Sequence, residues 1–360
     1  MNKRIGNIEF LRFVFSLCIV LHHAMIPEMK MWGGYLSVEF FFILSGYFME
    51  KHIYTTNLSD CSWQIILEND ILYCKKRIVG IMPFFIIATV IGSIVLGGVY
   101  SWEFSYERVM SIVADFFFVQ SLGLPVASVT GIVWYLSSMF IGLLLVYPLI
   151  AKKIEYSKYV APTIAILCMG ILIYNYGSLN VPANYMFGII CTGNIRSISM
   201  IFLGAYVGYL SRRISVALDS KIRIFAATFI EISLYVCIIR HMHIWNEAIG
   251  KFDFLIVFAM VVAMSISLSG KSACTCILNN KVSIFLGKYS MALFLSHFYW
   301  VQNIDNIISI YKGNDTTMTA LKAKLIGLIL AFVTAFIVLG AGECFNLAIR
   351  TRFNKKEYVL

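Results

Sequence analysis

The sequence predicts an all-α fold: a polytopic integral membrane helical bundle of about ten transmembrane helices, with both termini cytoplasmic. Three observations lead to this prediction. Apolar residues make up 60% of the chain and charged residues only 13%, with a mean hydropathy of +0.81, a balance that excludes a soluble domain of this length. Apolar runs of about 17 to 22 residues alternate with short polar links. Lysine and arginine gather at alternate ends of these runs.

Taken in order, each span is an apolar run that ends at charged or turn-forming residues. The ten spans are about 7–27, 35–50, 77–98, 131–151, 159–176, 196–211, 222–240, 252–270, 284–304 and 324–348. With the amino terminus inside, about 20 lysines and arginines fall on the cytoplasmic side and 8 on the outer side. The apolar segment Val109–Gln120 is too short to span, so we expect an interfacial or re-entrant helix on the outer face. A single membrane-embedded domain over residues 1–360 follows.

Other readings of the composition are disfavoured. The net charge of +10 sits at the ends of apolar runs, so membrane topology explains it better than nucleic-acid binding. The nine cysteines lie mostly in apolar runs and form no disulfide framework, and the close pair Cys274 and Cys276 lacks the partners of a zinc site. We therefore expect no metal. The sequence also has no Gly-rich phosphate loop, H-E-x-x-H or G-x-S-x-G motif, which argues against ATP-driven, metalloprotease and serine hydrolase functions.

Two ionisable residues of the first span attract attention. Arg12 and His23 are eleven residues apart, which puts both on one stripe of a helix, roughly 16 Å apart along its axis. Ionisable groups within a span are by default functional and face the bundle interior or a wet cavity. The alternative is that Arg12 snorkels to the near headgroups while His23 lies at the opposite interface. Spacing alone leaves both interpretations open.

More polar and aromatic residues are expected at the depth of His23. The link between the first two spans is short, so these helices should be neighbours and Glu39 should lie level with His23. A carboxylate beside an imidazole fixes its tautomer and stabilises the imidazolium, as a general base requires. His297 and Trp134 fall in the same outer half. Their structural alternatives are helix packing for His297 and an aromatic belt for Trp134, whereas a buried Glu39 must find a partner or stay protonated.

A basic cluster, Lys75, Lys76 and Arg77, precedes the third span on the cytoplasmic side. Positive-inside topology and attraction to anionic lipid would explain it. The functional alternative is an anion site for a phosphate-bearing cytoplasmic donor, with Arg77 and Arg12 as the deeper cations. Composition does not choose between the two.

Five segments carry a resemblance to a known family. Ile8–Arg12 followed by His23 makes an arginine, ten residues, histidine pattern, and Ser37–Tyr47, Lys76–Pro83, Val133–Leu136 and Phe285–His297 follow along the chain. Together they resemble the motifs of the membrane acyltransferase-3 family, which O-acetylates bacterial surface and exported glycans. Aspartate commonly stands at the place of Glu39 in that family.

The resemblance implies an O-acyltransferase of the bacterial cytoplasmic membrane. It implies acetyl-CoA, or another short acyl-CoA, as a cytoplasmic co-substrate with no permanently bound cofactor, and a carbohydrate hydroxyl as acceptor. The lipid bilayer and glycan-assembly machinery would be its other partners. The residue roles it implies are general base for His23, orientation of His23 by Glu39, donor binding by Arg12, Lys76 and Arg77, and support from Trp134, Ser45 and His297. Whether a covalent acyl-enzyme forms on a serine such as Ser45 stays open.

The chain also departs from the family pattern. Gly80 stands where the family often has a second arginine, and Ser137-Ser138 stand near the place of a common glutamate. We expect the stand-alone form, without an appended extracytoplasmic hydrolase-like domain.

Two other functions fit the same residues. A transporter or lipid-linked glycan flippase would use Arg12, Glu39, Glu231 and Glu343 as substrate or proton groups and would move glycan without an acyl donor. The lack of visible repeats counts mildly against it. A structural partner in a glycan-export complex would tolerate any single polar substitution within the membrane.

Overall fold

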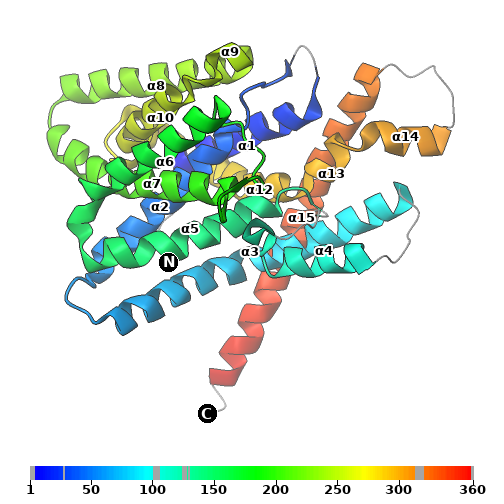
Figure 1. Ribbon diagram of the computed structural model, residues 1–360, viewed down its shortest axis with the longest axis horizontal. Helices are drawn as coiled ribbons and strands as arrows, with labels where there is room; N and C mark the ends of the chain where they lie inside the picture. The colour runs from blue at the N-terminus through cyan, green and yellow to red at the C-terminus, as the bar shows by residue number, and fades with distance from the viewer. Residues whose placement is uncertain are drawn as a thin grey trace.

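The computed structural model describes residues 5–26, 29–99, 106–123, 128, 130–312 and 320–357 (Figure 1). The α-helices are α1 (Gly6–Ala24), α2 (Leu36–Thr56), α3 (Trp63–Val99), α4 (Tyr106–Phe116), α5 (Val133–Lys152), α6 (Val160–Tyr176), α7 (Thr192–Ala217), α8 (Lys221–Ile244), α9 (Glu247–Gly250), α10 (Asp253–Leu268), α11 (Ala273–Leu278), α12 (Lys281–Ser296), α13 (Phe298–Val301), α14 (Ile304–Lys312) and α15 (Ala320–Glu357). Two 3-10 turns, η2 (Gln120–Leu122) and η3 (Ile154–Ser157), flank α5, and a hairpin of β1 (Met186–Phe187) and β2 (Ile190–Cys191) precedes α7.

Every predicted span coincides with helix, so the all-α bundle is confirmed. Five helices of the described residues are long and apolar enough to cross a membrane, namely α1, α3, α5, α8 and α15, while α6 and α10 are shorter apolar helices. The number of spans and the side of the termini stay predictions. Several helices extend beyond the predicted spans, most of all α3, which begins at Trp63 instead of residue 77, and the predicted span 284–304 is divided between α12 and α13.

The division falls at His297, whose side chain competes for the helix's own carbonyls. Its Nδ1 lies 2.9 Å from the carbonyl oxygen of Phe294 and 3.2 Å from that of Leu293. A ring nitrogen that occupies these acceptors interferes with the regular ladder of backbone bonds at this point. The interruption keeps the imidazole inside the bundle, where His297 is fully buried.

Helices α1 and α12, the first and ninth predicted spans, pack in parallel. The Ser16 hydroxyl donates to the carbonyl of Ser290, and further along the same two helices the rings of His23 and His297 are 5.5 Å apart between centroids. Successive spans cross the membrane in alternate directions, so the first and the ninth span should run in the same direction. Figure 1 also shows the links 57–62 and 153–159 at the left end of the bundle and α4 and α14 at the right end.

The predicted short helix before the fourth span is present as α4, an 11-residue helix (Tyr106–Phe116) that starts slightly earlier than expected. Eleven residues extend about 16 Å, too little to cross a bilayer. The buried Asp115 at its end accepts hydrogen bonds from Gln120 at 2.6 Å and from Ser128 at 3.0 Å. These bonds tie Gln120 and Ser128 to the end of α4.

The contact between α2 and α7 is unusually close because glycines line it. A Cβ added to Gly204 would collide with the backbone of Ile43 and Gly46, and one added to Gly46 would collide with the backbone of Ile201. Small residues of this kind let helix backbones approach in membranes, where tight packing drives association. The two helices therefore run side by side in backbone contact.

Two ion pairs join the same helices on either side of the glycine contact. Glu39 of α2 pairs with Arg196 of α7, and Glu50 of α2 pairs with Arg212 of α7, each at 2.5 Å. Both carboxylates are fully buried. Residue numbers rise together along the two helices, so α2 and α7 are parallel, as expected for the second and sixth spans.

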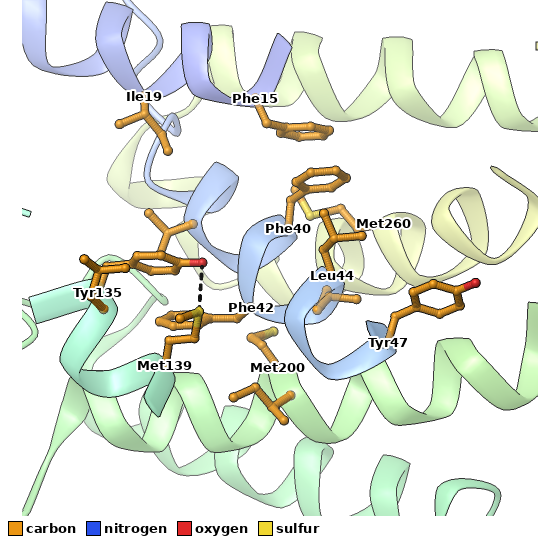
Figure 2. Packing of buried hydrophobic residues seen from close by; sticks show 14 of the residues in the cluster. Phe15, Ile19, Phe40, Phe42, Leu44, Tyr47, Tyr135, Met139, Met200 and Met260 are labelled. Carbon is orange, nitrogen blue, oxygen red and sulfur yellow. Dashed lines mark hydrogen bonds between the residues drawn. The ribbon is translucent and has the colours of Figure 1, made fainter. Parts of the chain in front are cut away.

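Aromatic packing completes the centre of the bundle (Figure 2). Phe15 of α1 stacks on Phe40 of α2, with centroids 4.1 Å apart and planes inclined by 13°. Two residues along, Phe42 turns to the other side of α2 and packs on Tyr135 of α5 at 4.7 Å. Helix α2 is thus clamped between α1 and α5 by rings on opposite faces, which fixes the helices that line the candidate site.

Adding one methyl group at Gly204 should weaken the bundle, because its neighbours are backbone atoms that cannot move aside. We expect Gly204→Ala to lower the free energy of unfolding by about 1–3 kcal/mol. Thermal unfolding of purified protein in detergent measures this. Gly170→Ala in α6, where a Cβ would meet nothing within 4 Å, is the matched control and should not lower the melting temperature. Equal melting temperatures for the two variants would contradict the close contact.

Candidate functional site

A basic cavity opens at the end of the bundle that the sequence assigns to the cytoplasm. This mouth cavity has a volume of about 550 Å³. Its charged lining is Arg12, Lys76, Arg77, Lys288 and Glu343. The three cations predicted to bind the donor therefore meet in one place. Lys288 was not predicted; it pairs with Glu343 of α15 at 2.7 Å.

The two arginines of the mouth cavity are held by neighbours one turn away. Arg12 donates to the carboxylate of Glu9 at 3.1 Å. Arg77 donates to the hydroxyl of Tyr73 at 2.5 Å and lies over its ring, 4.7 Å from the centroid. The guanidinium groups are thus oriented before any ligand arrives, which lowers the entropy cost of binding an anion.

A second, mainly apolar cavity of about 210 Å³ continues from the first. This middle cavity shares Arg12, Arg77, Ile81 and Met291 with the mouth cavity. Ser45 lines it too, and its hydroxyl donates to the carbonyl of Phe41 at 2.9 Å. Among the described residues no histidine is hydrogen-bonded to Ser45, so its role as a nucleophile has no visible base and stays a prediction.

A third cavity of about 320 Å³ lies beyond the second and contains the predicted base. This outer cavity shares Tyr135 and Phe294 with the middle cavity. His23, Trp134 and Arg196 also line it. The three cavities therefore follow one another along the bundle, with Arg12 at one end of α1 and His23 near the other.

His23 faces a second histidine. Its ring lies 5.5 Å from that of His297 and 5.1 Å from that of Phe298, centroid to centroid. Both contacts of the His297 Nδ1 atom are carbonyl oxygens, which only accept, so Nδ1 carries the proton. Its Nε2 is then a lone-pair acceptor, and it is buried without a hydrogen-bond partner among the residues that the structure describes.

The predicted contact between Glu39 and His23 is not found among the described residues. Glu39 instead accepts two hydrogen bonds from Arg196, at 2.8 Å from Nε and 2.5 Å from Nη2. Arg196 lies over Trp134, 5.4 Å from the ring centroid. The predicted residues Glu39 and Trp134 are thus linked, but through an arginine that sequence reasoning counted only as an outer-side charge.

A signal for Arg196 was present in the sequence. It is a cation at the start of an apolar run, and α2 supplies a buried acid at the matching depth. Charges within spans pair with one another, but one sequence does not reveal which helices touch.

In the described part of the chain, no three His, Cys, Asp or Glu side chains lie together so that they could hold a metal ion. A family model described as an acyltransferase domain matches residues 5–341. Neither the curated proteins nor the solved structures contain a match to the chain.

Removing one member of the Glu39–Arg196 pair should be far more damaging than removing both. We expect Glu39→Leu and Arg196→Leu each to lower the free energy of unfolding by about 3–5 kcal/mol, since each leaves a buried charge alone. The double variant should lose much less free energy of unfolding than the two single variants together. Denaturant unfolding in detergent measures the difference, which is the coupling energy of the pair. The exposed Asp219–Arg223 pair is the control and should couple by about 0.2–1 kcal/mol. Additive losses at Glu39 and Arg196 would contradict the pairing.

Proposed function

The chain belongs to this acyltransferase family, and from that premise we propose that it transfers an acyl group, most simply acetyl, from cytoplasmic acyl-CoA to a hydroxyl of a cell-surface or exported glycan. The enzyme would lie in the bacterial cytoplasmic membrane as a multi-pass protein. One observation carries the proposal: three cavities with shared lining residues lead from a cluster of cations to His23.

The mouth cavity suits the phosphates of coenzyme A. Among the described lining residues, Arg12, Lys76, Arg77 and Lys288 give it four cations against the one carboxylate of Glu343. Guanidinium groups bind phosphate oxygens in pairs, and lysine adds a mobile point charge. The smaller, mainly apolar middle cavity suits the long arm of the coenzyme, so the thioester would arrive at the end of that cavity nearest His23.

The reaction needs one base. The acceptor hydroxyl, bound in the outer cavity, would give its proton to His23 as its oxygen attacks the thioester carbonyl carbon. A carbon–oxygen bond forms, the carbon–sulfur bond breaks, and the coenzyme leaves as a thiol after it takes the proton from the imidazolium. Holding donor and acceptor on either side of His23 supplies the orientation that makes the step fast.

His297 takes the position beside His23 that the sequence suggested for Glu39. Its Nε2, which has no partner among the described residues, can accept a hydrogen bond from a ring N–H of His23 and so orient that imidazole. Glu39 would act indirectly, since it fixes Arg196 at the wall of the outer cavity. Trp134, under that arginine, offers a ring on which a sugar can pack.

Replacing His23 by alanine should lower acyl transfer by about 10²–10⁴-fold, because the step loses its base. Mass spectrometry of surface polysaccharide from cells with and without each variant measures ester content and acyl mass. His243→Ala is the control, since His243 is exposed and lines none of the three cavities.

Two results would count against the proposal. Unchanged esterification in a correctly inserted His23→Ala variant would show that His23 is not the base. A glycan that reaches the surface only when the protein is present, and that carries no added acyl mass, would favour a transporter.

Loss of a mouth-cavity cation should weaken donor binding. We expect Arg77→Gln to raise the dissociation constant for acetyl-CoA by about 10- to 100-fold, as expected for one charge-assisted hydrogen bond. Calorimetry on purified protein measures the constant, and salt should weaken wild-type binding. Arg213→Gln, on α7 and outside the three cavities, is the matched control. Equal weakening by both variants would place the phosphate site elsewhere.

A further inference from the structure

Three aromatic rings from three helices meet where the middle cavity ends and the outer cavity begins. They are Phe41 of α2, Tyr135 of α5 and Phe294 of α12. Their centroids are 5.4 Å apart for Tyr135–Phe294, 6.1 Å for Phe41–Phe294 and 6.5 Å for Phe41–Tyr135. Rings at such separations are in direct contact. The three rings, called here the aromatic collar, therefore form one contiguous cluster.

The collar is the boundary between the two cavities. Tyr135 and Phe294 line both the middle and the outer cavity, while Phe41 lines the middle cavity only. His23 lies in the outer cavity, and the Phe294 ring is 6.0 Å from the ring of His297 beside it. A group that travels from the middle cavity toward His23 by way of these shared residues therefore passes next to the rings.

The three rings differ in how firmly they are held. Tyr135 is only 7% exposed, packs on Phe42 at 4.7 Å, and donates its hydroxyl to the sulfur of Met139 at 3.7 Å, as Figure 2 shows. Phe294 is partly exposed to the space on both of its sides. Tyr135 is thus a fixed wall, and Phe294 is the ring whose rotation would open the boundary.

We propose that the aromatic collar sets the length of the acyl chain that this protein transfers; the inference rests on the proposed acyl-CoA-dependent reaction. A thioester that enters through the middle cavity must bring its carbonyl carbon to the collar to meet His23. The carbons beyond the carbonyl then lie among the three rings. A two-carbon acyl group needs little room there, whereas each further methylene must displace ring atoms of Phe294 or Phe41.

Shortening Phe294 tests this directly. The full-length purified protein is given acetyl-, butanoyl- or hexanoyl-CoA, with surface polysaccharide stripped of its esters by alkali as the acceptor. Thiol release gives the rate, and mass spectrometry identifies the ester formed. We expect Phe294→Ala to raise the ratio of kcat/KM for butanoyl-CoA to that for acetyl-CoA by about tenfold or more, the discrimination that methylene-sized changes in an apolar pocket carry.

Two further variants sharpen the test. Phe294→Leu keeps an apolar side chain of intermediate size and should shift the ratio in the same direction by a smaller factor, so the conclusion survives if the alanine variant fails to fold. Phe48→Ala is the matched control, since Phe48 lines the middle cavity but is not one of the three collar rings. It should leave the ratio within about twofold of wild type, because the methylene discrimination lies elsewhere.

The outcomes separate the two hypotheses. Suppose that the wild type transfers acetyl normally and that both Phe294 variants keep the wild-type ratio of kcat/KM for butanoyl-CoA to acetyl-CoA. The proposal that the collar sets chain length would then be wrong, and the proposed function would stand. An equal shift in Phe48→Ala would also overturn the collar proposal, since the size of the whole middle cavity would then decide chain length. No transfer by the wild type from any of the three thioesters would overturn the proposed function, and the collar with it.

Discussion

Charges buried among membrane helices must find partners on other helices, and this requirement organises the bundle. The pairs Glu39–Arg196 and Glu50–Arg212 tie α2 to α7 near both ends of a glycine-lined contact. Either charge left alone in this setting would cost several kcal/mol, so the pairs fix the register of the two helices. That register has a consequence for the site. It sets Arg196 in the wall of the outer cavity, while the other face of α2 presents Phe41 to the middle cavity.

The parallel pair α1 and α12 runs along the series of three cavities and is held together near both ends. At one end Glu9 of α1 approaches Gly287 so closely that a side chain there would collide with it, and the same carboxylate holds Arg12. At the other end His23 meets His297. Because both helices rise about 1.5 Å per residue in the same direction, Arg12 and His23 stay a fixed distance apart.

The sequence was informative about depth and poor at predicting contacts. Apolar runs placed helices, and the position of a residue within its run placed Arg12, Lys76 and Arg77 at one end and His23 and Trp134 toward the other, which agrees with the cavities they line. Which side of a helix meets which neighbour depends on packing over the whole chain. The partner of Glu39 is 157 residues away, so a short link suggested His23 where the fold supplies Arg196. The interruption of the predicted ninth span at His297 was also missed, since it arises from one side chain bonding to local carbonyls.

The unexpected partner of Glu39 and the interruption at His297 have related physical causes. A carboxylate beside His23 would have to be desolvated deep in the bundle. The guanidinium of Arg196 offsets the desolvation of Glu39. A neutral imidazole carries no such penalty. With its Nδ1 proton committed to backbone carbonyls, His297 can present a lone pair to His23 without adding charge to the outer cavity. The same local bonds interrupt the helix at His297, three residues after Phe294, so one ring of the collar and the imidazole beside His23 lie on one short segment. The proposed control of acyl chain length and the proposed orientation of His23 would therefore both act from the same end of α12.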